Sequence, residues 1–362
     1  KKLYLNRVSI SRLEKFAQCP FRHLIDEGLR PVKEKPFEFD PIQRGIVLHS
    51  CVEQLLKQNG LDDTDEDGAE SIMQQIFDSE LSGRIAPYAG DSATAYAGME
   101  TVRRAAGRAA RLLYRQLQKG VFRPVEMELR FGPKDIEMIR LRDGSQVQLD
   151  GQIDRVDLGR HENERFAFVV DYKTGNKDLN AGEIYAGLQL QLLVYLAVAL
   201  KRYGAKSAGV YYFRIAERMV NTESRDALEV DKERTKQLRM KGIAPRDPAL
   251  LREMSDEPER LISVGFKKDG NLSAEGSYAT QEEFERLIKH ALKRSSELTQ
   301  DIMDGKTDIS PSVTGSSDAC RYCDNRPVCL RDGHIRGGRR RKPPKMKLSQ
   351  LNELLQAEEN ET

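Results

Sequence analysis

The strongest constraint on the fold is a pair of apolar segments that flank a helix. Residues 166–173 read FAFVVDYK and residues 208–215 read AGVYYFRI, compositions that are typical of buried strands. Between them lies a helical stretch of about twenty residues that begins at Gly182. Parallel neighbouring strands need a crossover connection, and that connection is usually an α-helix. The spacing of these two strands around the helix fits such a connection. The sequence therefore predicts a parallel βαβ unit.

A second group of strands precedes this unit. From Pro124 the pattern changes to period two, because VEMELRF alternates apolar and charged residues. The segment IEMIRLR then runs into Asp143-Gly144, which is a hairpin turn signal, and the chain returns through SQVQLDGQIDRVDL. This pattern predicts an antiparallel meander beside the βαβ unit. We therefore expect an α/β core sheet that spans residues 124–215.

The rest of the chain is helical or irregular in pattern. Ser11 and Glu14 form a capping-box pattern that predicts a short helix ending at Cys19-Pro20. An acidic stretch at 61–70 predicts a loop between helices. We expect six parts, namely an N-terminal segment (1–40), a helical region (41–123), the α/β core (124–215), a peripheral insertion with an amphipathic helix at 281–305 (216–305), a cysteine segment (306–335) and a basic flexible tail (336–362).

Composition narrows the class of protein. Lys and Arg number 59 against 57 Asp and Glu, and apolar residues make up 39%, which fits a soluble core with some solvated segments. The longest apolar run, 188–200, is interrupted by glutamine and is too short for a membrane span, so a membrane protein is excluded. No secretion signal follows Lys1, which predicts a cytoplasmic chain and a fragment of a longer one.

Positive charge is concentrated in two places. Residues 336–347 carry seven Lys and Arg together with Gly and Pro, so this segment is either a solvated linker or an arm that contacts DNA. The second cluster is a stripe along one face of a predicted helix, which either tracks phosphates or is a solvated face. The stripe consists of Arg104, Arg108, Arg111, Arg115 and Lys119.

A charged pair ends the strand at 166–173. Because successive strand residues point to opposite faces, Asp171 and Lys173 share one face while Tyr172 points to the other. Asp154 lies at the far end of the preceding strand. Two carboxylates and the Tyr172 carbonyl form an oxygen cage suited to Mg²⁺, and Lys173 can orient a metal-activated water beside a phosphate. The alternative is an ordinary ion pair at the sheet edge.

Two helical pairs extend this set. Gln191 and Tyr195 are four residues apart, as are His49 and Glu53, so each pair shares a helix face. The ordered set resembles the RecB-type nucleases of the PD-(D/E)XK superfamily. Its members are RGxxxH at 44–49, GQIDRVD at 151–157, DYKTG at 171–175 and QxxxY at 191–195.

This resemblance implies a fold, a reaction and a set of site residues. The fold is a restriction-endonuclease-like mixed central sheet flanked by helices, and the reaction is Mg²⁺-dependent hydrolysis of DNA. Glu128 aligns only loosely with an acidic position of such sheets. The implied residues are Asp154, Asp171 and Lys173 as the catalytic core, His49, Gln191 and Tyr195 in support, and Asp154, Asp171, Tyr172 and His49 as metal ligands.

The cysteines indicate a second metal site. Cys320, Cys323 and Cys329 supply three thiolates in a C-x2-C-x5-C pattern, and Cys19 is the candidate fourth ligand. Spacing alone leaves open a zinc site and a four-cysteine iron–sulfur site. Cys51 has no partner pattern and is expected to be a small buried hydrophobe.

One N-terminal and three C-terminal cysteines around a RecB-type core resemble the iron-staple nucleases. These include the AddB-type subunits of bacterial AddAB helicase–nucleases, and the likeness covers nearly all of residues 9–331. The segments that carry it are SISRLEKFAQCPF, the stretch from DYKTG to GVYYFRI, KKDGNLS and CRYCDNRPVC.

The AddB-type resemblance implies cofactors, substrate and partner. It implies a 4Fe-4S cluster on the four cysteines, cleavage of single-stranded DNA at ends in recombinational double-strand break repair, and an AddA-type helicase–nuclease partner. No GxxxxGKS or GxxxxGKT phosphate loop occurs, so we expect no ATP hydrolysis by this chain. The alternative function is a non-catalytic DNA-binding module with a structural metal cluster.

Overall fold

The structure is a computed structural model that describes nine stretches of the chain. Each of the six expected parts includes residues outside these stretches, among them 32–40, 85–92, 216–225, 330–339 and Asn176 in the turn after the DYK strand. The described residues are 6–31, 41–58, 61–84, 93–175, 177–215, 226–274, 276–314, 318–329 and 340–361.

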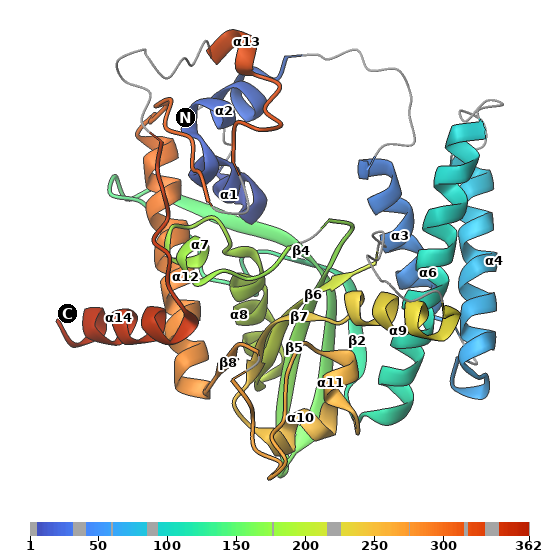
Figure 1. Ribbon diagram of the computed structural model, residues 1–362. Coiled ribbons are helices and arrows are strands. Elements are labelled where there is room, and N and C mark those ends of the chain that lie inside the picture. Colours follow the sequence, from blue (N-terminus) through green and yellow to red (C-terminus); the bar gives the residue numbers. More distant parts are fainter. Residues whose placement is uncertain are drawn as a thin grey trace.

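A mixed sheet forms the centre of the molecule (Figure 1). Its strand order among the described residues is β1-β4-β5-β6-β7-β8, with β2 and β3 also paired to β4. The mixed α/β sheet expected from the sequence is therefore confirmed. The strands are β1 (Arg7–Ser9), β2 (Arg123–Phe131), β3 (Ile139–Arg140), β4 (Gln146–His161), β5 (Glu164–Lys173), β6 (Lys206–Arg214), β7 (Lys241–Pro245) and β8 (Tyr278–Ala279).

Helices cover both faces of this sheet. On one face the group α3, α4 and α6 stands together, and on the other lie α8, α12 and α14 (Figure 1). The helices are α1 (Ile10–Gln18), α2 (Pro20–His23), η1 (Leu24–Leu29), α3 (Pro41–Leu56), η2 (Leu61–Asp63), α4 (Glu66–Arg84), α6 (Ala93–Lys119), α7 (Ala181–Tyr185), α8 (Gln191–Tyr203), α9 (Ala227–Gln237), α10 (Pro248–Met254), α11 (Pro258–Leu261), α12 (Gln281–Met303), α13 (Arg326–Cys329) and α14 (Leu348–Asn360).

Two apolar cores result from this layering. Leu48 of α3 and Phe168 of β5 belong to the core on the first face, whereas Leu193 of α8 and Leu287 of α12 belong to the second. All four side chains are buried, which is the main source of stability for such a fold. Within the described parts of the chain, each helix is too short or too polar to cross a bilayer.

The βαβ unit and the hairpin are confirmed, with one difference. β5 and β6 pair in parallel through α8, and β3 returns to β4 through a turn that contains Gly144. The single helix expected from Gly182 is instead two, because the chain turns at 186–190 with Gly187 at a φ of 80°. As a result α8 has an N-terminus of its own, at Gln191, close to the end of β5.

The sheet extends beyond the expected core. β7 pairs antiparallel with β6, and β8 pairs parallel with β7. The part of 216–305 that was expected to be peripheral therefore contains two sheet strands. β7 has five residues and β8 two, and strands of such length carry too little alternation to be recognised. The amphipathic helix expected at 281–305 is confirmed as α12.

The acidic stretch at 61–70 is not the expected loop. It forms η2 and then the first turn of α4, where acidic side chains are favoured by the helix dipole. Its carboxylates face the basic stripe of α6: Glu66 pairs with Arg115 at 2.6 Å, and Glu70 pairs with Arg111. Arg104, Arg111, Arg115 and Lys119 of the stripe therefore have acidic partners, which favours the solvated face over a path for phosphates.

Residues 340–361 do not form the flexible tail that was expected. α14 packs on α12 through the buried Leu351 and Leu355, and Arg341 donates to the backbone oxygens of Ala17 and Ser310. The low apolar content of the basic stretch concealed this docking, because Arg341 is anchored by carbonyl groups of a distant segment.

The N-terminal helix ends where expected but begins differently. α1 ends at Gln18 with Cys19 as its C-cap. Its N-cap is Ser9 and Ser11 lies inside the helix, so the expected capping box does not form. The carboxylate of Glu14 instead accepts hydrogen bonds from backbone groups at the start of α8.

A buried ion pair lies within β4. Arg155 and Asp157 are fully buried and form a bidentate pair, and Gln116 of α6 donates to Asp157 at 3.0 Å. Asp157→Ala is expected to lower the free energy of unfolding by about 3–5 kcal/mol, because it leaves the Arg155 charge without its counterion. Urea unfolding measures this loss. The double variant Arg155→Met/Asp157→Leu is expected to recover most of it, and equal loss in both variants would contradict the explanation.

Candidate active site

Asp154 and Asp171 lie on adjacent strands. In the antiparallel pairing of β4 with β5, Arg155 is opposite Val170, so the next pair along is Asp154 with Asp171. Directly opposed residues project to the same face of a sheet. The Asp154 side chain also accepts a hydrogen bond of 2.7 Å from the backbone N–H of Tyr172. Their residues are only 9% and 1% exposed, so two acids share one sparsely solvated position.

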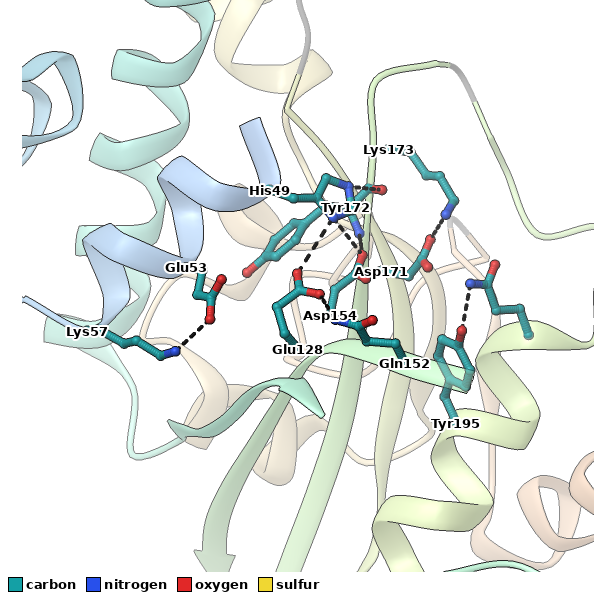
Figure 2. A network of polar contacts seen from close by, with 11 residues as sticks. His49, Glu53, Lys57, Glu128, Gln152, Asp154, Asp171, Tyr172, Lys173 and Tyr195 are labelled. Atoms are coloured by element: carbon teal, nitrogen blue, oxygen red, sulfur yellow. Dashed lines mark hydrogen bonds and ion pairs between the residues drawn. The ribbon is translucent and has the colours of Figure 1, made fainter. Parts of the chain in front are cut away.

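His49 approaches these acids from the helical region. Its Nε2 lies 3.1 Å from the Tyr172 carbonyl oxygen, and its Nδ1 lies 3.6 Å from Asp154 Oδ2 (Figure 2). Glu128 of β2 completes the group, with its Oε1 3.9 Å from His49 Nδ1. One ligand atom from each of His49, Glu128 and Asp154 lies within 4.8 Å of the other two.

The electrostatics of this group favour a bound cation. Burial, followed by the charge of Asp171, raises the pKa of Asp154 to about 7. Burial alone would lower the pKa of His49, but its contact with Glu128 and the charges of Asp154 and Asp171 outweigh this, so the pKa is raised. Carboxylate and carbonyl oxygens are the donors preferred by Mg²⁺ and Mn²⁺, so the residues present fit a divalent cation.

Lys173 lies on the same side as the two acids. Its ammonium group forms an ion pair with Asp171 (Figure 2). The same group lies 5.7 Å from the centre of the Tyr212 ring. Asp171 is thereby adjacent to Asp154 on one side and to Lys173 on the other. The structure brings together the two acids, the amine and His49, as the sequence pattern predicts.

The helical pair on α8 is arranged differently from the expectation. Gln191 donates a hydrogen bond of 2.9 Å to the hydroxyl of Tyr195 rather than to Lys173. Tyr195 is buried and packs edge-on against Phe131 of β2. Glu53, which shares a helix face with His49, is paired with Lys57. Gln191 and Tyr195 therefore border the acids without bonding to the amine.

Glu128 belongs to the site although the sequence pattern gave little indication of it. Its backbone has a φ of 55°, in the left-handed region that disfavours side chains, and its carboxylate accepts from Gln152. Strained backbone of this kind is concentrated at functional sites, where the surrounding structure maintains it. The sequence signals were its place in the alternating strand and its loose alignment with an acidic position of such sheets.

The strain at Glu128 can be measured with two variants. Without added metal, Glu128→Gly is expected to be more stable than Glu128→Ala by about 1 kcal/mol, because only alanine places a Cβ at a left-handed position. Both variants should lose part of the Mg²⁺-induced rise in the free energy of unfolding. Chemical denaturation with and without Mg²⁺ gives both quantities, and an alanine variant that is the more stable of the two would contradict the strain.

The four candidate cluster cysteines lie on segments that contact each other. Cys19 is buried at the end of α1, and α13, which ends at Cys329, lies beside α2 in Figure 1. Asn325 donates to Asp26 at 2.8 Å between these segments. Burial raises the pKa of the Cys19 thiol, and the charge of Cys329 adds to the rise.

The cysteine side chains do not form a compact group of three in the part of the chain that the structure describes. None of the five, all within the described residues, forms a disulfide, and Cys51 is buried in the core beside α3 as expected. In a closed zinc site, bonds of about 2.3 Å hold the sulfur atoms about 3.8 Å apart. Among the described residues only His49, Glu128 and Asp154 bring three ligand atoms within 4.8 Å, so no three cysteine sulfurs lie at zinc spacing.

The strand arrangement and the paired acids with an adjacent amine define a class of protein. The chain belongs to the PD-(D/E)XK nuclease superfamily, whose family model matches residues 7–330. α14 and the segment before it, residues 340–347, lie outside that match.

More specific relatives share one description, the B-type component of an ATP-dependent helicase/deoxyribonuclease. The chain is 29% identical over 381 residues to the protein of Thermoanaerobacter sp. strain X514 and 30% identical over 379 residues to that of Alkaliphilus metalliredigens. Each alignment covers 99% of this chain and 33% of the relative. The protein of Clostridioides difficile is 32% identical over 354 residues, which is 91% of this chain and 30% of the relative. The chain therefore spans about a third of the length of these relatives.

Proposed function

We propose that this chain is a metal-dependent nuclease domain that hydrolyses phosphodiester bonds in single-stranded DNA. The observation that carries the proposal is the adjacency of Asp154 and Asp171 with the Lys173 ammonium on the same side. Two buried acids and an amine in this arrangement are costly unless a charged ligand binds there. Membership of the nuclease superfamily supports the same reaction.

The residues of the site have separate roles in this reaction. The cation would be held by Asp154, Asp171, His49 and the Tyr172 carbonyl, with Glu128 as a further acid; when bound, it supplies an acidified water and offsets phosphate charge. Lys173, held by Asp171, places a positive charge next to the reacting phosphate and stabilises charge that develops on it. Gln191 and Tyr195 border the acids, where they can contact the DNA backbone.

We also propose that Cys19, Cys320, Cys323 and Cys329 hold a 4Fe-4S cluster. The proposal rests on the C-x2-C-x5-C pattern together with Cys19, and on the resemblance of this cysteine arrangement to the iron-staple nucleases. Three cysteines within ten residues suit metal ligation in a reducing compartment better than a disulfide framework, so we propose a cytoplasmic location.

The partner and the biological role follow from the relatives. Their description includes a helicase, whereas no phosphate loop occurs in this chain, so ATP-driven movement is assigned to the rest of the protein and to an AddA-type partner. We infer that the domain cuts single strands delivered from DNA ends, in recombinational repair of double-strand breaks. Because cations of α6 are paired with acids, we do not assign that helix as the path for the strand.

A cleavage assay separates this function from a non-catalytic DNA-binding module. End-labelled single-stranded DNA is incubated with the chain and Mg²⁺, and matched reactions contain a chelator or duplex DNA. We expect shortened products only with Mg²⁺ and mainly from the single strand. Intact substrate in every reaction, together with retained DNA binding, would establish the binding module instead.

A further inference from the structure

Glu14 is a buried acid outside the metal group whose role the reaction does not explain. It lies on α1, its residue is 7% exposed, and its Oε1 accepts hydrogen bonds from the backbone N–H groups of Leu190 and Gln191 at 2.7 and 2.9 Å. These are groups at the start of α8, where a helix leaves its N–H groups without internal partners. A carboxylate at this position is favoured by both the hydrogen bonds and the helix dipole.

The anchored helix is the one that carries Gln191 and Tyr195. The N–H of Gln191 is bound by Glu14 while its side chain is bound to Tyr195. The rotation and axial position of α8 determine where both side chains lie against the end of β5. Glu14 therefore constrains two site residues through the backbone of one of them.

The second carboxylate oxygen of Glu14 lies near the ammonium group of Lys177, four residues after Lys173. Glu14 Oε2 lies 3.8 Å from the ammonium group of Lys177. Lys177 lies 5.0 Å from the centre of the Tyr212 ring, and Lys173 lies 5.7 Å from the centre of the same ring. One carboxylate thus contacts the start of α8 and a cation that shares an aromatic ring with Lys173.

α1 connects this carboxylate to two further parts of the molecule. At its N-terminal side, Ser9 of β1 pairs with Asp150 of β4, four residues before Asp154. At its other end lies Cys19, about 7.5 Å along the helix axis from Glu14. α1 therefore contacts or adjoins three parts of the molecule. They are β4, which carries Asp154, the start of α8, and Cys19.

We propose that Glu14 is a positioning residue for cleavage, which holds α8 in register with the Asp171–Lys173 pair and couples that register to the cysteine-bearing end of α1. The inference rests on the proposed nuclease function.

Three variants test this role in the 362-residue chain. Glu14→Ala removes the acceptor, and Glu14→Gln keeps an acceptor oxygen at the same position. Glu27→Ala is the matched control, because Glu27 bonds Lys15 and Arg12 on α1 without a contact to α8. Visible absorption establishes that each preparation contains the same amount of cluster.

Kinetics with a labelled single-stranded oligonucleotide and Mg²⁺ give the first readout. Glu14→Ala is expected to lower kcat by about 10-fold to 100-fold with little change in KM, because a small displacement of site groups acts on the reacting geometry. Glu14→Gln should recover kcat to within about threefold of the unmodified chain, since a neutral acceptor replaces a charged one. Glu27→Ala should leave kcat unchanged. A glutamine variant as slow as the alanine variant, or an equal loss in Glu27→Ala, would overturn the positioning role.

Hydrogen exchange gives a second readout that does not depend on cleavage. Faster exchange of the peptide covering 188–196 is expected in Glu14→Ala alone, because the freed N–H groups lose their acceptor. Unchanged exchange in this peptide would overturn the inference whatever the kinetics show. If the unmodified chain cuts no DNA, the proposed function fails, and the exchange result alone then decides whether Glu14 anchors α8.

Discussion

Asp171→Asn is expected to reduce the rate of DNA cleavage by at least about a thousandfold. Asparagine keeps the size of the side chain but removes a charge that is almost completely buried between Asp154 and Lys173. The substitution weakens the attraction for a divalent cation, and it also removes the counterion that holds the Lys173 ammonium in place. Initial rates on labelled single-stranded DNA at saturating Mg²⁺ measure the effect.

Asp178→Asn serves as the matched control for this substitution. Asp178 lies five residues beyond Lys173, its side chain is 55% exposed, and it pairs with Lys241 at 2.9 Å. Removal of this charge should leave cleavage within about twofold of the unmodified rate, because exposed ion pairs contribute little. Cleavage at the full rate by Asp171→Asn would show that the reaction does not depend on this carboxylate and would contradict the proposed active site.

A calorimetric measurement separates the loss of metal binding from a defect in chemistry. A ligand that binds only the folded state at about 100 times its Kd stabilises it by about 2.7 kcal/mol. The unmodified chain should therefore melt at a higher temperature in Mg²⁺ than in a chelator, and Asp178→Asn should behave in the same way. In Asp171→Asn this difference should be much smaller. An unchanged difference would mean that Asp171 acts on the reaction without contributing to the cation site.

Local patterns predicted the centre of the fold and most of its site. Side chains alternate along a strand, so Asp171 and Lys173 lie on one face of β5 independently of the rest of the chain. The two apolar strands on either side of α8 pair in parallel, as the spacing around a crossover helix predicts. These inferences depend on residues that are close in sequence, so they do not require knowledge of the tertiary structure. Asp154 could be added because antiparallel neighbours are connected through a short turn.

The parts that sequence reasoning missed depend on long-range contacts. Glu14 appeared to be a capping residue of its own helix, whereas its hydrogen bonds go to Leu190 and Gln191, 176 and 177 residues away. The basic stripe of α6 resembled a surface for phosphates, but Arg115 meets Glu66 across the helix pair. In each case the charged residues were recognised correctly from the sequence. Their bonding partners could not be, because those partners are distant in sequence and are brought close only by the tertiary structure.

Cys19→Ser is expected to remove the visible absorption of the cluster and to lower the melting temperature of the domain. Cys19 and the C-terminal cysteines are about 300 residues apart in the chain, and closing a loop of that length constrains the unfolded state by an amount on the order of 5 kcal/mol. Serine is close in size to cysteine but is a poor ligand for iron. Differential scanning calorimetry, iron analysis and the absorption spectrum measure the three expected losses.

Cys51→Ser provides the control, because Cys51 is fully buried in the core beside α3. It should also cost stability through the burial of a hydroxyl group, yet it should retain iron and colour. A fall in melting temperature without loss of iron therefore identifies a packing effect. A fall in melting temperature together with loss of iron identifies Cys19 as a ligand of the proposed cluster. Unchanged iron content and melting in Cys19→Ser would contradict a role for this residue as a ligand.

The contacts around the cysteines predict which segment is released when the cluster is lost. Residues 306–314 and 340–347 remain tied to α1 by direct bonds, since Ser312 donates to the Gln18 carbonyl at 2.7 Å and Arg341 donates to that of Ala17. Segment 318–329 is joined to the N-terminal part by the Asn325–Asp26 hydrogen bond, and its first residues are held to 312–313 by the bond from the Ala319 N–H to the Ser312 carbonyl at 3.1 Å. We expect the proposed metal centre to hold the residues beyond Ala319. Limited proteolysis of Cys19→Ser should therefore cut first within 318–329 and spare α14. Early cleavage at α14 instead would mean that the cluster supports the whole C-terminal part, and not mainly the segment that carries its ligands.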